Sequence, residues 1–359
     1  MQKKIIALAI ASALAVPAVA MAEATVYGQM NMAYEVIDNG ADTALVGTAA
    51  DSTSNVSSNK SRLGFKGTED LGNGLTFLWQ MEGEVMGDTG ANSLFSRNTF
   101  AGLSNEYGTG VWGNHDTPYK MASGKTNVFK DTVADNRTIM GAGLHEARLS
   151  DVAAYISPDF SGFNFAAAYV GKNDNTLPTP AASTIMSATS ISANYARDNY
   201  TVSVANQTIT QEDKAVVANE GDLTATKLAG TYSMDMFTVA LVYEMLSSDV
   251  GGPKTENDNV YLSAKFKATD KGTVKFGYTS AGESKTGGAT NAGSGATQVA
   301  LGYDHKLTDN TSVYALYTSV DNDTAATFGL GSKGSTAGIK TVAAGLDPNA
   351  IAIGMRMSF

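Results

Sequence analysis

The chain has 359 residues, of which 43% are hydrophobic and only 17% are charged, with 37 Gly, 7 Pro and no Cys. The apolar fraction excludes a disordered chain, and the lack of a glycine period or a sustained heptad excludes collagen-like and coiled-coil architectures. The formal net charge of −10 argues against a nucleic-acid partner, since phosphate binding needs a basic face. Without cysteine there is no disulfide scaffold, thiolate zinc site or cysteine nucleophile.

The first segment, Met1–Ala22, has the layout of a secretory signal peptide. Two lysines give a positive start, the apolar run Ile5–Ala15 follows, and Pro17 precedes the small-x-small site Ala20–Ala22. A membrane anchor is the alternative, but the run is shorter than the ~20 residues that a spanning helix needs. We therefore expect cleavage before Glu23, and one β-barrel domain over 23–359.

The rest of the chain alternates with period two, where a helix would repeat every 3.6 residues. The last segment shows it best, because Ile351, Ile353, Met355, Met357 and Phe359 alternate with small or polar residues. Sixteen such stretches begin near residues 25, 61, 75, 96, 110, 148, 163, 188, 200, 226, 236, 259, 273, 297, 311 and 350. Their connections are alternately short and long, and the first long one is Ile37–Lys60. The pattern predicts an all-β, 16-stranded antiparallel transmembrane β-barrel, with short periplasmic turns and long external loops.

Two other β architectures are alternatives to the barrel. A secreted sandwich needs a buried apolar interior, whereas here one strand face is rich in Tyr, Phe and Met and the opposite face carries charges. A parallel β-helix needs a repeat of fixed length, and none is visible. Both alternatives therefore fit the sequence less well than a barrel in a membrane.

Four segments carry motifs. Ser61–Leu75 reads SRLGFKGTEDLGNGL, Thr25–Gly28 reads TVYG, Arg97–Leu103 reads RNTFAGL, and Tyr155–Phe163 reads YISPDFSGF. They resemble the SRxGFKGxEDLGxGL, LYG, RxxFVGL and YxSPxFxGF segments of the Gram-negative general porins, a family that includes neisserial, burkholderial and Vibrio-type porins. The resemblance extends from Glu23 to Phe359.

The resemblance implies a homotrimeric, passive diffusion channel for ions and small hydrophilic solutes in the cell outer membrane. It also implies that the third long loop, Asp116–Glu146, folds into the barrel and narrows it. This loop carries the charged residues Lys120, Lys125, Lys130, Asp131, Asp135 and Arg137. The terminal Phe359 resembles the aromatic signal that such barrels present to their assembly machinery, which is an implied partner together with outer-membrane lipid and lipopolysaccharide.

Alternate residues of a strand point to opposite faces, so the position of a residue along its strand (its strand parity) tells which face it is on. The face opposite the apolar side chains is expected to line the lumen. Its basic residues are Arg62, Lys66, Arg97, Arg148, Lys227, Lys265, Lys267, Lys275, Lys306 and Arg356, and its acidic residues are Glu35, Glu82, Glu84, Glu244 and Asp304. We expect Arg62, Arg97 and Arg148 to share one wall, with Asp131 and Asp135 of the loop opposite. Opposed charges in a narrow passage orient dipolar solutes, and the basic excess predicts a weak anion preference.

No catalytic constellation, cofactor motif or metal site is expected. His115, His145 and His305 lack metal-ligand spacing, and Gly329–Gly334 fits G-x-G-x-x-G only inside a glycine-rich loop. The alternatives to a general channel are a substrate-selective anion channel and a barrel whose loops serve as an adhesin or receptor surface.

Overall fold

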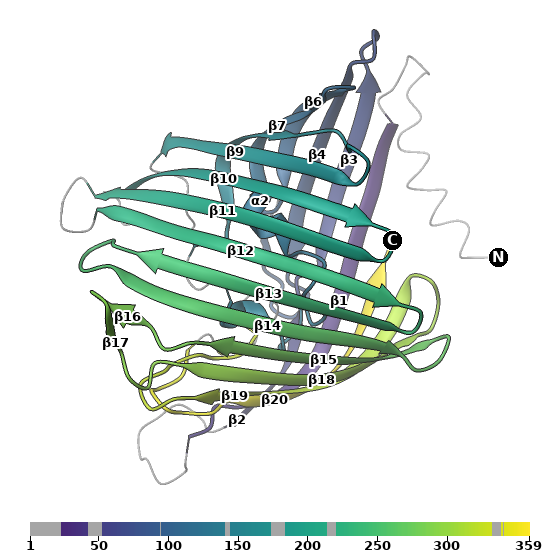
Figure 1. Cartoon of the computed structure of the whole chain (residues 1–359). Helices are drawn as coiled ribbons and strands as arrows, with labels where there is room; N and C mark the ends of the chain where they lie inside the picture. Colours follow the sequence, from purple (N-terminus) through teal and green to yellow (C-terminus); the bar gives the residue numbers. More distant parts are fainter. Residues whose placement is uncertain are drawn as a thin grey trace.

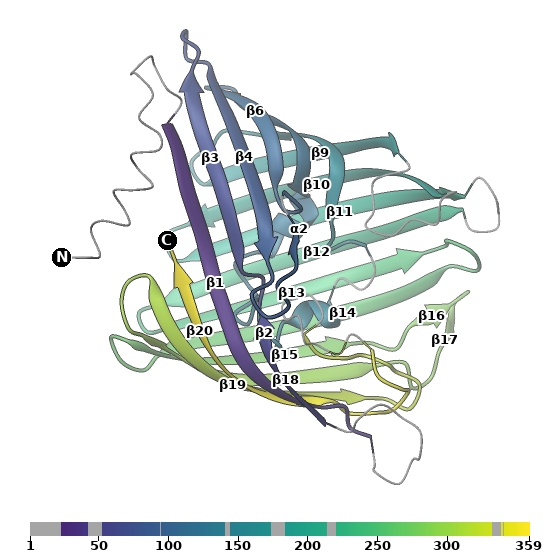
Figure 2. The same cartoon turned by 180° about the vertical axis from the view of Figure 1, so that it is seen from behind.

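The computed structural model describes residues 23–41, 52–93, 95–140, 144–173, 184–213, 220–331, 339 and 341–359. Within these ranges the chain is almost entirely β, and its long strands surround a lumen (Figures 1 and 2). The sixteen wall strands are β1 (Glu23–Asp38), β3 (Arg62–Asp70), β4 (Thr76–Val85), β6 (Thr99–Asn105), β7 (Gly108–Asp116), β8 (Arg148–Ile156), β9 (Phe163–Asn173), β10 (Thr184–Arg197), β11 (Tyr200–Asp213), β12 (Gly221–Met234), β13 (Phe237–Ser248), β14 (Thr255–Lys267), β15 (Gly272–Ala281), β18 (Ala296–Lys306), β19 (Thr311–Asn322) and β20 (Asn349–Ser358).

The wall is a closed antiparallel sheet. Each wall strand pairs with the wall strands before and after it, and β1 pairs with both β3 and β20, so that the first and last strands close the ring. Closure leaves no open strand edge in the wall. The connections alternate as the sequence predicts: residues 198–199 join β10 to β11, whereas residues 117–147 join β7 to β8. The predicted 16-stranded barrel is confirmed.

The two faces of the wall differ as the period-two pattern predicts. On β20, Ile351 and Ile353 are 57% and 65% exposed, whereas Ala350 and Ala352 are each 1% exposed. Exposed apolar side chains of this kind form the outer surface, which suits a surrounding of lipid chains. No helix among the described residues is long and apolar enough to cross a membrane. The predicted signal peptide, Met1–Ala22, lies outside the described residues.

The first long loop is shorter than the sequence predicts. Within the expected loop Ile37–Lys60, residues Ser52–Ser58 form β2, which pairs with the second half of β1. The register against β1 shifts by one residue between β2 and β3, and Lys60 has a φ of 58° there. The sequence does not predict β2, because Val56 is its single large apolar residue and the segment carries no period-two signal. The other short strands are β5 (Asn92–Ser93), β16 (Lys285–Thr286) and β17 (Ala289–Thr290).

The third long loop, which we call loop 3, folds into the lumen as expected (Figure 2). It contains the short helix α2 (Pro118–Ala122) and the 3₁₀ turn η1 (Asn136–Thr138). Its apolar residues are buried against the inner face of the wall and the loop after β19. This cluster includes Phe129, Val133, Ala134 and Ile139 of loop 3 together with Ala281, Leu316, Val320, Ala326 and Leu330. The buried area holds the loop inside the barrel.

Candidate functional site

Loop 3 crosses the lumen because side chains from separate strands of the wall, among them β14 and β1, bind its backbone. Helix α2 begins where the Thr117 side chain accepts a hydrogen bond from Lys120 N, with Pro118 in its first turn. The chain then follows the inner wall, where Ser263 Oγ of β14 donates to Thr126 O at 2.8 Å. At the tip, Asn31 Nδ2 of β1 donates to Asp131 O at 2.8 Å. The loop therefore spans the barrel from β7 to β1 and narrows it.

Asp131 at the tip joins the loop to the opposite wall. Its φ is 58°, which turns the chain back sharply. Its carboxylate lies 3.2 Å from Nη1 of Arg62 on β3 and 3.3 Å from Nη2 of Arg137 in the returning arm. The sequence predicts that Asp131 faces the arginine wall, and in the structure the two groups are in direct contact.

Asp135 does not face the lumen, in contrast to the expectation. It is 0% exposed and binds Arg137, Asn127 Nδ2 and the backbone N–H of Asp131. Burial alone would raise its pKa, but the charge and hydrogen bonds of Arg137 lower the pKa to about 2. Its ionised carboxylate thus fixes the turn of loop 3, a role that strand parity could not reveal because the residue is not on a strand.

The other two wall arginines each have a carboxylate partner. Arg97, just before β6, forms an ion pair with Glu82 of β4, which also accepts a hydrogen bond from Tyr27. Arg148 of β8 lies 3.0 Å from Asp116 at the end of β7. Because both pairs join neighbouring parts of one wall, the expected arginine cluster is present but is largely neutralised by carboxylates.

Several lysines near the narrowing differ in their surroundings. Lys120 lies 2.8 Å from Asp116. Lys125 and Lys130 of loop 3 are exposed, and neither has an ion-pair partner among the described residues. Lys66 of β3 is also exposed, and its Nζ lies 5.3 Å from the centre of the Tyr27 ring. The free positive charges thus come from the loop and from β3.

These contacts hold loop 3 against the wall of β3–β8 on the side of the arginines. The family model of the Gram-negative porins matches residues 7–325. The chain belongs to the Gram-negative porin family. It is a passive channel protein of the outer membrane.

One relative aligns with this porin over its full length. It is 29% identical over 373 residues to outer membrane porin protein 32 of Delftia acidovorans, and the alignment covers 100% of both chains. Among solved structures, an anion-selective porin from Comamonas acidovorans matches with a TM-score of 0.76 and 23% identity, over 94% of this chain and 100% of that one. The trimer form of OmpT from Vibrio cholerae matches with a TM-score of 0.69 and 19% identity, over 94% and 99%.

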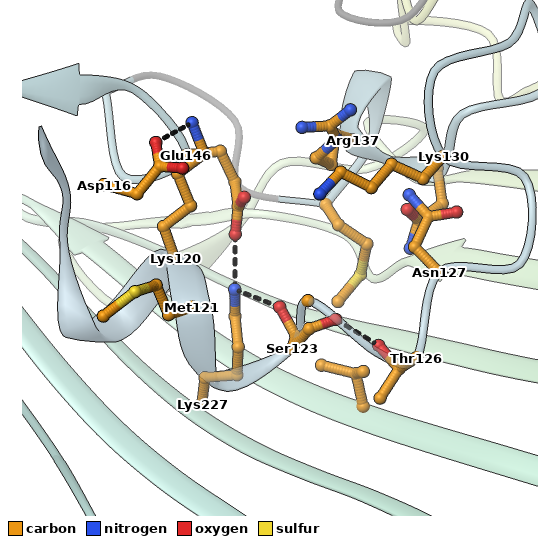
Figure 3. A pocket seen from close by; sticks show the side chains of 14 residues that line it. Asp116, Lys120, Met121, Ser123, Thr126, Asn127, Lys130, Arg137, Glu146 and Lys227 are labelled. Atoms are coloured by element: carbon orange, nitrogen blue, oxygen red, sulfur yellow. Dashed lines mark hydrogen bonds and ion pairs between the residues drawn. The ribbon is translucent and has the colours of Figure 1, made fainter. Parts of the chain in front are cut away.

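Two charges that strand parity assigns to the lumen of this porin are buried beneath the base of loop 3, and Figure 3 shows one of them, Lys227. Lys227 of β12 is 1% exposed and Glu244 of β13 is 0% exposed. Lys227 forms ion pairs with Glu244 and with Glu146 at the end of the loop, and Tyr119 donates to Glu244. Burial raises the pKa of Tyr119, and the nearby Glu244 raises it further, so the phenol keeps its proton. The sequence gives no sign of this cluster, because the covering loop is distant in sequence.

A cavity of about 190 Å³ lies between the two arms of loop 3 and the wall (Figure 3). Lys120, Ser123 and Lys130 of the outgoing arm and Arg137 and Glu146 of the returning arm line it, among others. Of the remaining lumen charges of the porin, Arg356 of β20 also reaches loop 3, because its Nη2 donates to Lys130 O at 3.4 Å. Lys275 pairs with Asp304 at 2.7 Å, Glu84 pairs with Lys60 at 3.0 Å, and Lys267 and Lys306 end strands β14 and β18 beside short turns. Those last two lysines are therefore outside the narrowing.

Proposed function

We propose that the channel is a homotrimer in which loop 3 sets a weak preference for small anions. The passage is bounded on one side by Arg62, Arg97 and Arg148 and on the other by loop 3. The contact between Arg62 and Asp131 supports the place of loop 3 in this proposal, because it ties the loop to the wall, and the exposed lysines without partners support the preference for anions. The trimer form of the OmpT neighbour supports the trimer.

The anion preference follows from which charges have partners. The three wall arginines each have a carboxylate within 4.0 Å, so each contributes mainly a dipole. Lys66, Lys125 and Lys130 are exposed and have no such partner among the described residues, which leaves an excess positive charge. Acidic external loops act more weakly, because their charge is screened over about 8 Å at physiological salt.

A general channel fits these pairs better than a channel selective for one anion. A substrate-specific path needs a series of free arginines or lysines along the pore, whereas here the wall arginines are already bound by carboxylates. We infer that no reaction is catalysed and that no cofactor takes part. Permeation of ions and small hydrophilic solutes then needs only the aqueous lumen of a 16-stranded barrel.

The test is the reversal potential of wild type and variants in a salt gradient across a bilayer. Lys130→Glu should move the reversal potential towards cations, since it replaces a free positive charge beside the passage. Lys271→Glu is the matched control, because Lys271 is exposed but lies in the short turn after β14. An equal shift in both variants, or in neither, would contradict the role of loop 3.

We also propose that Phe359 is a signal for the outer-membrane barrel assembly machinery, with lipid and lipopolysaccharide as the surroundings of the inserted barrel. Phe359 ends the outward-facing row of β20 and is 55% exposed. Deleting Phe359 should reduce outer-membrane insertion while export across the inner membrane continues. Normal insertion of the deletion variant, measured by fractionation of cells, would rule this out.

A further inference from the structure

The joint between β1 and β20 is made at its end by Gly28 and Phe359. Gly28 N donates to Phe359 O at 3.0 Å, and Phe359 N donates to Gly28 O at 3.1 Å. A Cβ atom on Gly28 would lie only 2.9 Å from Cε1 of Phe359, and it would come closer still to Cζ. The phenyl ring therefore occupies the space that a side chain at position 28 would fill.

The ring lies on the outer face of the wall. Val26 and Met30, which share the parity of Gly28, are 47% and 38% exposed, and Phe359 follows the exposed residues of β20. Gly28 itself is buried, although it has no side chain. Its φ is outside the left-handed region, so an alanine there would be hindered by the ring and by Arg62 O rather than by backbone strain.

The neighbouring strand pairs contain a similar arrangement on the inner face of the wall. Tyr27 lies opposite Gly64 across β1 and β3, and a Cβ on Gly64 would lie 2.7 Å from Cε1 of Tyr27. Tyr314 lies opposite Gly354 across β19 and β20, and the corresponding distance is 2.8 Å. Three consecutive strand pairs around the closing joint thus each place an aromatic ring over a glycine.

We propose that Gly28 is a binding site for the terminal aromatic ring of this same chain, and that their contact closes the barrel without help from any other protein. The proposal concerns the residue suggested above as an assembly signal, but it assigns Phe359 a second role. As a signal, Phe359 is recognised before insertion. As a closing contact, it stabilises the finished barrel.

The position of the joint explains why such a contact is useful. β1 and β20 are the two ends of the domain, so their pairing joins residues more than 300 positions apart and pays the largest loop-closure cost in the wall. An aromatic ring over a glycine shields the bare backbone of the strand and adds cross-strand packing. The contact therefore stabilises the pairing of β1 with β20, which has the largest loop-closure cost in the wall.

The experiment folds the full mature chain from urea into vesicles of short-chain phosphatidylcholine that contain no other protein. The folded fraction is followed by the shift in gel mobility between unheated and boiled samples. Phe359→Leu keeps an apolar residue but removes the ring, and we expect folding about fivefold slower than wild type. Phe359→Tyr keeps the ring and should fold at the wild-type rate.

The partner residue is tested by Gly28→Ala alone and combined with Phe359→Leu. Since both changes break one contact, the double variant should fold no more slowly than the slower single variant. Gly110→Ala is the glycine control, because a Cβ there meets no atom within 4 Å. Phe237→Leu is the aromatic control, because Phe237 is 47% exposed and stacks on Phe266 rather than on a glycine. Each control should combine additively with Phe359→Leu.

Wild-type folding of Phe359→Leu in these vesicles would overturn the proposal. If that variant were also inserted poorly in cells, Phe359 would be a recognition signal only. Should Gly28→Ala fail to fold at all, the comparison of Phe359→Leu with Phe359→Tyr still decides, since it leaves position 28 unchanged. Equal slowing of both Phe359 variants would likewise contradict a role for the ring.

Discussion

Phe129 of loop 3 packs directly over Gly302 of β18. A Cβ on Gly302 would lie 2.8 Å from Cε1 of Phe129, and one on Gly277 of β15 would lie 3.2 Å from the same ring. Phe129 is 1% exposed, and Lys275 Nζ lies 5.4 Å from its ring centre. Two glycines on adjacent strands therefore leave room for the ring that anchors the loop.

Replacing Gly302 by valine should displace loop 3 from the wall and widen the passage. Phe129→Ala should do so as well, because a buried phenylalanine contributes about 3 kcal/mol to packing. The measurement is single-channel conductance in a bilayer together with uptake of sugars of increasing size. Gly230→Val is the control, because a Cβ at position 230 of β12 would approach Thr201 O of β11 and no atom of loop 3. Unchanged conductance in both Gly302→Val and Phe129→Ala would show that Phe129 does not anchor the loop.

Acid should release the returning arm of loop 3 only at very low pH. The pKa of Asp135 in the folded protein, about 2, is below its ordinary value of 3.8, so its stabilisation is complete above pH ~4 and is lost as the pH falls through about 2. The shift corresponds to about 2 kcal/mol. Conductance recorded from pH 7 to pH 2 should thus change near the acid end. Asp135→Asn should give the altered conductance already at pH 7, and a flat wild-type profile would contradict this role.

Lys227→Ala should destabilise the barrel strongly. The substitution leaves Glu244 and Glu146 without their shared cation in a buried site, which typically costs about 3–5 kcal/mol. Thermal unfolding in detergent should therefore occur at a clearly lower temperature. Lys267→Ala is the control, since Lys267 is exposed and its nearest carboxylate is 4.0 Å away. Similar unfolding temperatures for the two variants would argue against the buried cluster.

The native protein should resist SDS at room temperature and migrate as an oligomer until it is boiled. The closed sheet pairs every wall strand on both sides, so detergent finds no open edge at which to start unfolding. The measurement compares unheated and boiled samples by electrophoresis. Monomeric migration of the folded barrel without heating would contradict the homotrimer and leave the barrel itself untouched.

The strands were predictable because lipid and water impose opposite demands on alternate residues, as Ile351 and Ala352 illustrate. The contact of Arg62 with Asp131 was partly predictable, since parity places Arg62 in the lumen and the family resemblance brings loop 3 inside. The burial of Lys227 and Asp135 was not. Both depend on where loop 3 touches the wall, which is decided by packing between residues far apart in the chain, such as Phe129 and Gly302. β2 was missed because a polar strand has no apolar alternation.

The pairing of the wall arginines with carboxylates makes the charge of the pore easy to alter during evolution. Loss of Glu82 would free the positive charge of Arg97, and loss of Arg97 would free the negative charge of Glu82. Substitution of either residue of such a pair would thus shift the ion preference of the channel towards anions or towards cations. The strands, the turns and the lipid-facing surface would stay unchanged. A lineage could adapt its outer membrane to a new ionic habitat in single steps.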